Sequence, residues 1–367
     1  MVICKSAIII NNRRPLMKSR VTAQDIADQL GLSRNTVSKA FNGTGSISDE
    51  TKDRILNKAI ELGYRQYAYM DSKPLNDQIP ISKEIALLTC NMPSPSHFGF
   101  HLLSTFEAVI SKSGYRLAMY MVREDDIAAM NFPINFSPNT TSGLICMEMF
   151  SESYNQLICN LGLPTLFVDT CVMNPKSPLK ADILLMESYN SVYSITKTLI
   201  DNNYKKIGFL GDKNHCLSFH ERWLGYRNAL IDYDLSYGEE FCILDKDSAP
   251  YSDSNWLSIR MKDLQQLPQA FICSNDYQAI NAIRAIKRLG LSVPEDILIV
   301  GFDDSPESKI IEPHLTTVHI PNKEMGEIAA NQLLSRIEAP ESPFYTIHIQ
   351  TQIKKRSSSG NIHFSEQ

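Results

Sequence analysis

Apolar residues recur at helical spacing in three short segments between residues 22 and 62. Within each segment they lie three or four positions apart, which places their side chains on one face of an α-helix. The expected inward residues are Ile26, Ala27 and Leu30 in the first helix, Val37, Ala40 and Phe41 in the second, and Ile55, Ala59 and Leu62 in the third. The pattern therefore predicts a small three-helix unit with its own core.

The starts of these helices carry residues that are suited to capping. Thr22, Ser33 and Ser48 each precede a helix, where a hydroxyl can accept a hydrogen bond from the N–H groups of the first turn. Asp25 completes a capping-box pattern with Thr22. Gly31 breaks the first helix and allows a tight turn into the second. The unit is thus predicted to be helix, short turn, helix, followed by a third helix.

Beyond residue 82 the pattern changes to short apolar runs that alternate with amphipathic segments. Strands are expected at residues 85–89, 116–121, 143–146, 164–169, 206–210, 270–273 and 297–301, and helices at 102–113, 191–201, 221–231 and 277–289. Alternation of strand and helix gives parallel sheets with right-handed crossovers. Because the series runs twice, the predicted fold class is α/β, with two doubly wound parallel-sheet lobes and a cleft between them, preceded by the three helices.

Domain boundaries follow from these changes of pattern. Residues 17–65 are expected to form the helical domain, and residues 66–82, which are polar and hold two prolines, a hinge or linker. The body is expected to take residues 83–358, with the first lobe at about 83–178 and 307–338 and the second at about 179–306 and 342–358. Residues 1–16 are expected to be a disordered extension or to precede a true start at Met17, and residues 359–367 are expected to be a tail.

Charge is spread unevenly along the 367 residues. The formal net charge of the whole chain is −5, yet residues 17–65 carry eight Lys or Arg against six Asp or Glu, and residues 1–16 add three positive charges. Residues 66–367 therefore carry −10. Such a body would repel DNA and leave contact to the small basic end. Charge that serves only solubility explains the same numbers equally well.

The second helix presents polar residues outward. Asn35 can pair bidentately with adenine, and Arg34 and Lys39 can donate to O6 and N7 of guanine. Short donors suited to phosphate oxygens are Ser33, Thr36 and Ser38. A generic three-helix bundle with a solvated face would show similar residues. The helix–glycine–helix spacing favours a helix-turn-helix that binds DNA.

Polar residues in the body follow the expected strands, where doubly wound sheets bind their ligands. Asn91 follows the first strand, Asp169 ends the fourth, Asp276 follows a strand of the second lobe, and Arg222 is expected to open a helix. Carboxylates and a guanidinium around one cleft suit bidentate hydrogen bonding to vicinal hydroxyls. The aromatic faces of Phe98 and Tyr251 can stack on a sugar ring or a base.

Each of these candidates also has a simpler explanation. Asp276 can cap the helix that is expected to begin at Tyr277. Arg222 can pair with Glu221 or with a surface acid, and aromatic residues beside glycines usually belong to a core. The residues alone leave both possibilities open.

The sequence holds no constellation of residues typical of an enzyme. It has no G-x-S-x-G elbow, P-loop or G-x-G-x-x-G, and its eight histidines have no obvious acid or nucleophile partner. The eight cysteines are scattered singly, which favours reduced thiols in a cytoplasmic protein and gives no metal-ligand spacing. No apolar run approaches the length of a membrane span. We therefore expect a cytoplasmic protein without enzymatic activity, cofactor, bound metal or membrane partner.

The N-terminal segment resembles the DNA-binding domain of the lactose/galactose repressor (LacI/GalR) family. The matching residues are Val21-Thr22, Asp25-Ile26-Ala27, Gly31-Leu32-Ser33, Thr36-Val37-Ser38, Phe41-Asn42-Gly43, Ser48, Thr51, Ile55 and Leu62-Gly63-Tyr64. The likeness continues in order through the body at Leu163-Pro164, Val168-Asp169, Lys206-Ile207-Gly208-Phe209, Arg222, Gly225-Tyr226, Ser274-Asn275-Asp276, Val293-Pro294, Gly301-Phe302-Asp303-Asp304, Leu315-Thr316-Thr317-Val318, Met325-Gly326 and Arg356-Ser357-Ser358. An ordered series of this length is far more specific than a lone motif.

The resemblance implies a periplasmic-binding-protein-like core and suggests roles for individual residues. Bases would be read by Arg34, Asn35 and Lys39, the DNA backbone would be contacted by Thr22, Ser33, Thr36, Ser38 and Asn42, and Tyr64 completes the predicted DNA-binding set. The effector would face Asp169, Arg222 and Asp276, and the predicted effector site also includes Asn91, Phe98 and Tyr251.

The hinge departs from the family pattern. Family members commonly have a small, basic helix here, with a leucine that wedges into the minor groove and kinks the DNA. In this chain Pro74 would stop such a helix, and Lys73 or a near neighbour stands at the position of the wedge. Either Tyr69 or Met70 serves as the wedge, or the hinge works differently.

Together these features predict a ligand-responsive, DNA-binding transcriptional regulator, with repression as the favoured output. Because the two-fold symmetry of a dimer is mirrored in its site, we expect a homodimer on a near-palindromic, double-stranded operator. A small sugar or sugar phosphate between the lobes is expected to set the affinity for the operator. The alternative is a sugar-binding module whose N-terminal helices serve protein interaction rather than DNA binding.

Overall fold

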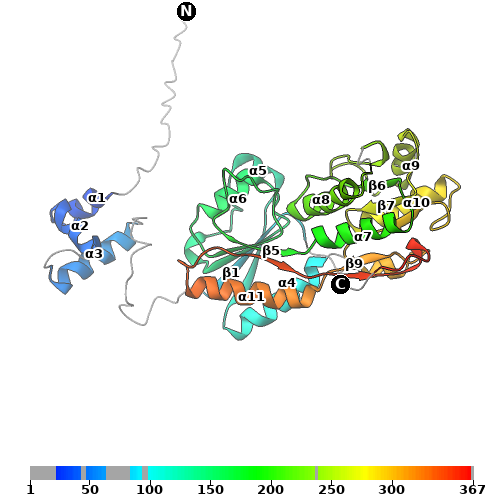
Figure 1. The fold of residues 1–367 in the computed structure, drawn as a ribbon. Helices are drawn as coiled ribbons and strands as arrows, with labels where there is room; N and C mark the ends of the chain where they lie inside the picture. Colours follow the sequence, from blue (N-terminus) through cyan, green and yellow to red (C-terminus); the bar gives the residue numbers. More distant parts are fainter. Residues whose placement is uncertain (1–21, 43–46, 63–82, 93–97, 236–238, 365–367) are drawn as a thin grey trace, which may run out of the picture. The chain divides into compact units, whose positions relative to one another are not determined.

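The computed structural model describes residues 22–42, 47–62, 83–92, 98–235 and 239–364, and the chain divides into two compact units, Met1–Ile79 and Pro80–Gln367 (Figure 1). The extension predicted at residues 1–16 and the hinge predicted at residues 66–82 lie outside the described residues. Within each unit the described residues show how the sequence determines the fold.

The N-terminal unit contains three helices, α1 (Ala23–Leu30), α2 (Arg34–Asn42) and α3 (Asp49–Glu61). Their shared core consists of Ile26, Ala27, Val37, Ala40, Ile55 and Ala59, all buried, with Leu30, Phe41 and Leu62 partly buried against them. This confirms the inward faces predicted from the helical spacing.

The predicted caps of this unit are also confirmed. Thr22 and Asp25 form a capping box, in which the backbone N–H of Thr22 donates to Oδ2 of Asp25 at 2.7 Å. These hydrogen bonds from Thr22 lower the pKa of Asp25. Gly31 adopts a left-handed conformation with φ of 67°, which allows the sharp turn into α2. Ser33 and Ser48 accept hydrogen bonds from the N–H groups of Thr36 and Thr51, at 3.0 and 3.4 Å.

A six-stranded parallel sheet forms one half of the larger unit. Its strands, from one edge to the other, are β2 (Arg116–Met121), β1 (Glu84–Thr89), β3 (Gly143–Met147), β4 (Thr165–Val168), β5 (Asp182–Met186) and β10 (Thr346–Ile349). Alternate residues face opposite sides. Ile85 and Leu87 join a core with α4 (Phe98–Lys112) and α11 (Asn322–Glu338), whereas Ala86 and Leu88 join one with α6 (Glu152–Cys159). The short helix α5 (Glu124–Ala129) lies on the α6 side (Figure 1).

A three-stranded parallel sheet forms the other half, in the order β6 (Ile207–Leu210), β7 (Ala270–Cys273) and β8 (Leu298–Val300). Helices α7 (Tyr189–Asp201) and α8 (Leu217–Asp232) cover one face, and α9 (Ser254–Asp263) and α10 (Asp276–Arg288) cover the other. Beside it β9 (Thr317–His319) pairs antiparallel with β11 (Gln352–Lys354). Short 3-10 turns occur at Pro138–Thr140, Glu239–Phe241, Pro306–Lys309 and Ser357–Ser359.

The predicted lobe boundaries need correction at three places. Strand β5 pairs with β4, and β10 pairs with β5, so both belong to the first sheet and not to the second lobe as expected. Strand β9, expected in the first lobe, pairs with β11, and its neighbour Thr316 bridges to Val300 of β8. An apolar run predicts that a strand is buried, but it does not specify the sheet that the strand joins.

The prediction of a tail at residues 359–367 is wrong for residues 359–364, which the structure describes. Ser359 is fully buried and its hydroxyl lies 2.7 Å from that of Thr316. Ile362 is buried in the large core and Phe364 packs against it. The chain therefore remains part of the body as far as residue 364.

A buried hydroxyl cluster lies where the chain passes from one sheet to the other. The hydroxyls of Ser191 and Thr351 are 2.7 Å apart, and both contact Glu187: Ser191 donates to its carboxylate and Thr351 to its carbonyl oxygen, each at 2.9 Å. Glu187 follows β5, Ser191 lies in the first turn of α7, and Thr351 joins β10 to β11. The cluster thus connects two of the segments that cross between the lobes by hydrogen bonds.

Two glycines allow helices to pack closely. A Cβ on Gly326 of α11 would lie 2.4 Å from the carbonyl oxygen of Leu102 in α4. A Cβ on Gly225 of α8 would lie 2.3 Å from the carbonyl oxygen of Tyr189 in α7. Figure 1 shows the two helices of the first pair side by side. Any larger residue would push the helices apart.

None of the helices among the described residues is long and apolar enough to span a membrane.

Candidate functional site

The outward face of α2 carries the predicted base-reading residues. Arg34, Asn35 and Lys39 are all exposed. At the start of the helix, the hydroxyls of Ser33 and Thr36 are 2.8 Å apart, and Ser33 also caps the helix. The face therefore belongs to a helix with a fixed start and a buried opposite side, as groove reading requires.

Two members of the predicted DNA-binding set cannot be placed in the same way. Asn42 ends α2, but its side chain lies outside what the structure describes, and Tyr64 lies outside the described residues altogether. Ser38 is half-buried on the same helix, and Thr22 acts as the cap of α1.

A cavity of about 720 Å³ lies where residues that follow the strands of both sheets meet. The first lobe contributes Glu148 and Phe150 after β3 and Asp169 after β4. The second contributes Arg222 from α8 and Asp276 from α10, among others. Carboxyl ends of parallel strands are the usual ligand site of such folds, and the volume suits a small molecule.

Four of the six predicted effector residues line this cavity: Asp169, Arg222, Tyr251 and Asp276. Asn91 is not among the described lining residues, but its amide donates to Glu148, which is, at 3.4 Å. Phe98 begins α4, several residues earlier than the helix was predicted to begin, and its side chain is not described.

Asp169 is buried and held by donors from two segments. Its Oδ2 accepts from the hydroxyl of Ser218 at 2.6 Å, and its Oδ1 accepts from the backbone N–H groups of Thr170 and Ser218 at 2.7 and 3.2 Å. Burial raises the pKa of Asp169, although these hydrogen bonds and the charge of Arg222 act in the opposite direction. Asp169 thus offers a desolvated, fixed acceptor at the cavity wall.

Asp276 does not cap the helix in which it lies, so that simpler explanation is wrong. The cap of α10 is Asn275, whose side chain accepts from the N–H of Gln278 at 2.9 Å. The carboxylate of Asp276 instead accepts from the N–H of Ser305 at 2.8 Å and the hydroxyl of Thr317 at 2.5 Å. Burial, followed by the nearby charge of Asp303, raises the pKa of Asp276 to about 8.

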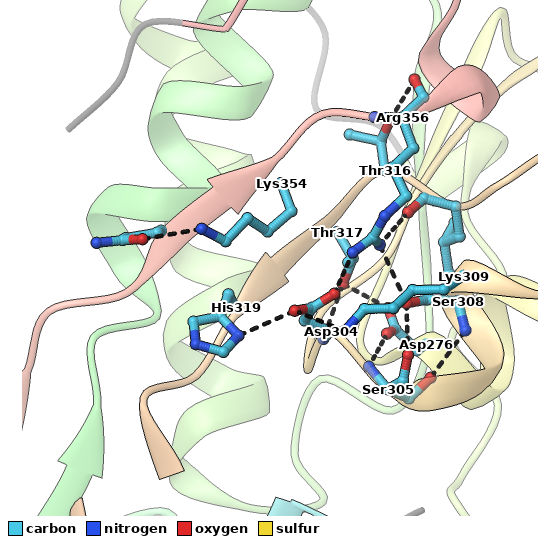
Figure 2. A network of polar contacts seen from close by, with 12 residues as sticks. Asp276, Asp304, Ser305, Ser308, Lys309, Thr316, Thr317, His319, Lys354 and Arg356 are labelled. Atoms are coloured by element: carbon cyan, nitrogen blue, oxygen red, sulfur yellow. Dashed lines mark hydrogen bonds and ion pairs between the residues drawn. The ribbon is translucent and has the colours of Figure 1, made fainter. Parts of the chain in front are cut away.

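A polar network continues from Asp276 to the crossing strands (Figure 2). Thr317, which donates to Asp276, accepts a hydrogen bond from the N–H of Asp304 at 3.3 Å. The carboxylate of Asp304 contacts Arg356, which follows β11, and lies 3.0 Å from Nδ1 of His319 on β9. A chain of direct contacts therefore links the cavity to β9 and to the segment that follows β11.

Arg222 lies within α8 rather than at its start, because this helix begins at Leu217. It does not pair with Glu221, which accepts instead from His348 at 3.0 Å. Arg222 is buried, donates to the carbonyl oxygen of Ser274, and stacks 3.6 Å from the ring centre of Phe302. Among the described residues, its Nε has no hydrogen-bond partner. The guanidinium is thus fixed in place with one donor left unsatisfied.

Tyr251 combines a core role with a place in the cavity wall. It is buried, its hydroxyl donates to the carbonyl oxygen of Asp245 at 2.8 Å, and its ring packs edge-on against Trp256. It therefore provides a rigid aromatic surface.

A second group of lining residues was not predicted from the sequence. His215 lies between Phe150 and Phe219, with ring centres 4.7 and 5.2 Å away, and its Nδ1 is 3.6 Å from Asp247. These residues show no periodicity and no motif, and Phe150 comes from the other lobe. Only the folded chain brings them together.

Backbone strain is concentrated at this cavity. Three lining carboxylates, Glu148, Asp169 and Asp303, have positive φ angles of 56°, 59° and 119°, and Asp304 follows with 52°. Such conformations cost on the order of 1–3 kcal/mol each and are typical of ligand sites. The strain independently marks the same place as the predicted effector site.

Two family models match the chain. The model of bacterial regulatory proteins of the lacI family matches residues 22–66, and the periplasmic-binding-protein-like domain matches residues 196–359. The HTH-type transcriptional repressor PurR of Aliivibrio salmonicida is 30% identical over 319 residues, which cover 86% of this chain and 92% of that protein.

Solved structures show the same fold. A transcriptional regulator CelR–cellobiose complex has a TM-score of 0.65 at 20% identity, over 92% of this chain and 100% of that one. The lac repressor dimer bound to operator and the anti-inducer ONPF has a TM-score of 0.62 at 20% identity, over 93% of this chain and 99% of that one.

A helix-turn-helix unit joined to a periplasmic-binding-protein-like body defines a ligand-responsive transcriptional regulator, which confirms the predicted fold class. The chain belongs to the LacI family of bacterial regulatory proteins. Its relatives are transcriptional repressors and not enzymes, which favours the regulator over the alternative of a sugar-binding module.

Proposed function

We propose that this protein is a homodimeric repressor that reads a near-palindromic operator through α2. The observation that carries the proposal is the exposure of Arg34, Asn35 and Lys39 together on one capped helix of the family's DNA-binding domain. Donors of these kinds discriminate base edges in the major groove. Thr22, Ser33, Thr36, Ser38 and Asn42 are proposed to contact the DNA backbone, and Tyr64 is proposed to belong to the same DNA-binding set. A repressor of this kind acts where the operator is, in the cytoplasm.

The cavity is proposed to bind the effector. Asp169 and Asp276 offer fixed acceptors and Arg222 a fixed donor, an arrangement suited to a small ligand with hydroxyl groups such as a sugar. Cellobiose in the complex of a similarly folded regulator is consistent with this class. A ligand that binds one lobe arrangement better than another shifts the equilibrium between them, and this shift would set how the two DNA-binding units of a dimer are held.

The operator contact is tested by an alanine change at Asn35. We expect the full-length protein to bind DNA from upstream of its own coding region in a gel shift, and Asn35→Ala to weaken this binding by about 1–3 kcal/mol. The matched control is Asn57→Ala, which changes the same residue type at an exposed position of α3 and is expected to leave binding unchanged.

Two further results would bear on the proposal. Sequence-independent binding by the wild-type protein, or equal binding by Asn35→Ala, would contradict the base-reading role. A dimer in sedimentation velocity, with a large loss of affinity for half of the palindrome, is expected from two-fold recognition.

A further inference from the structure

Thr317 stands between the cavity and the segments that cross between the lobes (Figure 2). It is the first residue of β9, its side chain is fully buried, and the chain after β9 continues into α11 of the first lobe. Its hydroxyl donates to Oδ1 of Asp276 at 2.5 Å and accepts from the backbone N–H of Asp304 at 3.3 Å. One hydroxyl group therefore joins a carboxyl group of the cavity wall to the backbone of a second acidic residue.

The carboxyl group of Asp276 has little room to move. Its Oδ2 accepts from the N–H of Ser305 at 2.8 Å, and the residue is only 1% exposed. A Cβ on Gly301, at the end of β8, would lie 2.3 Å from Oδ1 of Asp276. A group that is confined in this way responds to a ligand or a proton chiefly through its hydrogen bonds.

The surroundings of Asp276 favour its neutral form. Burial and then the charge of Asp303 raise the pKa of Asp276 to about 8, whereas the hydrogen bond from Thr317 lowers it. Cys273 on β7 and Arg222 on α8 lie on neighbouring elements, and burial and the charge of Asp276 raise the pKa of the Cys273 thiol. A hydrogen-bond donor supplied by a ligand would shift Asp276 toward its ionised form.

The hydrogen bond between Thr317 and Asp276 depends on the proton of Asp276. A hydroxyl has a single proton to donate. Toward an ionised Asp276, Thr317 donates, and its oxygen still accepts from Asp304. If Oδ1 of Asp276 carries a proton, both Asp276 and Asp304 donate to the same oxygen, and the proton of Thr317 loses its acceptor. Because hydrogen bonds to an ionised acceptor are about twice as strong as neutral ones, protonation also weakens the contact.

Asp304 carries the contact on to the crossing segments. Its carboxylate contacts Arg356, which follows β11, His319 on β9 at 3.0 Å, and Lys309 at 3.6 Å. The backbone of Asp304 is left-handed, with φ of 52°, a conformation that residues other than glycine rarely adopt. The hydrogen bond from its N–H to Thr317 helps to hold that conformation, so a change at Thr317 reaches Asp304 directly.

We propose that Thr317 is a positioning residue that couples the charge of the Asp276 carboxyl group to Asp304 and to the segments that cross between the lobes. This inference rests on the proposed function, because it concerns how the effector cavity is regulated. An effector hydroxyl that donates to Asp276 favours the carboxylate, and the carboxylate holds Thr317 and Asp304 in the observed arrangement. The effector would thereby favour one arrangement of the crossing segments.

The first test measures how Thr317 acts on the titration of Asp276. Urea unfolding of the full-length protein is followed between about pH 6 and 10 and compared with that of Asp276→Asn, so that the difference isolates Asp276. This difference should fall as the pH rises and level off near pH 8, where the folded protein has released the proton. Thr317→Val removes a hydrogen bond to the charged form, so the levelling point should move up by about one pH unit.

Controls separate this role from a merely structural one. Each Thr317 variant is compared with its own Asp276→Asn double variant, and Thr317→Ser, which keeps the hydroxyl, should restore the wild-type profile. The matched control is Thr165→Val in the first lobe, where Thr165 is also buried and its hydroxyl donates to the carbonyl oxygen of Leu163 at 2.7 Å. It should lower the stability without moving the levelling point. If Thr317→Val also lowers the profile without shifting it, the inference is overturned.

A second measurement follows the coupling itself and does not depend on the stability of Thr317→Val. The imidazole signals of His319, assigned with His319→Gln in protein that contains isotope-labelled histidine, should change near pH 8 as Asp276 titrates. This change should be absent from Asp276→Asn and Thr317→Val and present in Thr317→Ser. Its absence from the wild-type protein, or its persistence in Thr317→Val, overturns the inference.

A gel shift of the same preparation, with DNA from upstream of the coding region, separates the two proposals. Specific DNA binding by the wild-type protein together with an unshifted Thr317→Val profile rejects only the role of Thr317. Loss of specific DNA binding by the wild-type protein rejects the proposed function itself.

Discussion

At the scale of single residues, the buried carboxyl group of Asp276 makes the cavity sensitive to pH. An unfolded aspartic acid releases its proton near a pKa of about 4, whereas burial and Asp303 raise the pKa of Asp276 to about 8 in the folded protein. The folded state therefore binds more protons between these two values. The contribution of Asp276 to stability is therefore fully present below the window and is lost as the pH rises through it.

Replacing Asp276 with asparagine should remove this dependence. The neutral amide occupies nearly the same volume, so we expect the stability of Asp276→Asn to decline less than that of the wild-type protein between about pH 6 and 8. Urea unfolding followed by circular dichroism measures both profiles. Asp201→Asn, at an exposed carboxylate, should follow the wild-type profile. A wild-type profile that rises relative to Asp276→Asn across the window would refute the assignment.

At the scale of elements, glycines set the distance between paired helices. Gly326 and Gly225 occupy family landmarks in the sequence, and the structure gives their physical reason, which is the approach of a carbonyl oxygen from the neighbouring helix. Because α11 and α4 cover one face of the six-stranded sheet together, their separation fixes how that face is packed.

An alanine at Gly326 should therefore destabilise the body. We expect Gly326→Ala to lower the free energy of unfolding by about 1–3 kcal/mol, because the added methyl group forces α11 away from Leu102. The control is Ser335→Ala, which introduces the same residue at an exposed position of the same helix. Chemical denaturation of both variants measures the change in the free energy of unfolding. An unchanged or increased stability for Gly326→Ala would show that the helices can separate without cost.

At the scale of the larger unit, the buried cluster of Glu187, Ser191 and Thr351 links two of the segments that cross between the lobes. Movement of one lobe relative to the other must be absorbed at such crossings, since the two sheets are separate. Rigid hydrogen bonds there would limit which lobe arrangements are available.

Removing one hydroxyl from this cluster should weaken the junction. Thr351→Val removes the hydrogen bond to the carbonyl oxygen of Glu187 and one of the two contacts of the Ser191 hydroxyl, so we expect the free energy of unfolding to fall by about 1–3 kcal/mol. Faster amide hydrogen exchange near Ser191 should accompany it. Thr346→Val, at an exposed position of β10, is the control. If both variants behave alike, the cluster does not stabilise the crossing.

The sequence was informative where the deciding interactions are local. The caps at Thr22, Ser33 and Ser48 and the inward faces of the first three helices depend on residues within one or two turns, and all were predictable. Sheet membership was not: β10 joins the first sheet by pairing with β5, more than 150 residues earlier in the chain, and the apolar run of β5 does not specify that it pairs with β4. The contact between Phe150 and His215 was not predicted for the same reason, since it forms only where the two lobes lie against each other.

The separation of tasks between Asn275 and Asp276 has a consequence for how new regulators of this kind could arise. Since Asn275 alone caps α10, a mutation at the neighbouring position can alter ligand chemistry without removing the start of the helix. Selection, or a designer of biosensors, can therefore vary the recognised molecule while the scaffold keeps its fold. Such variants would keep α10 at its normal length and an N-terminal DNA-binding unit that still recognises the original operator.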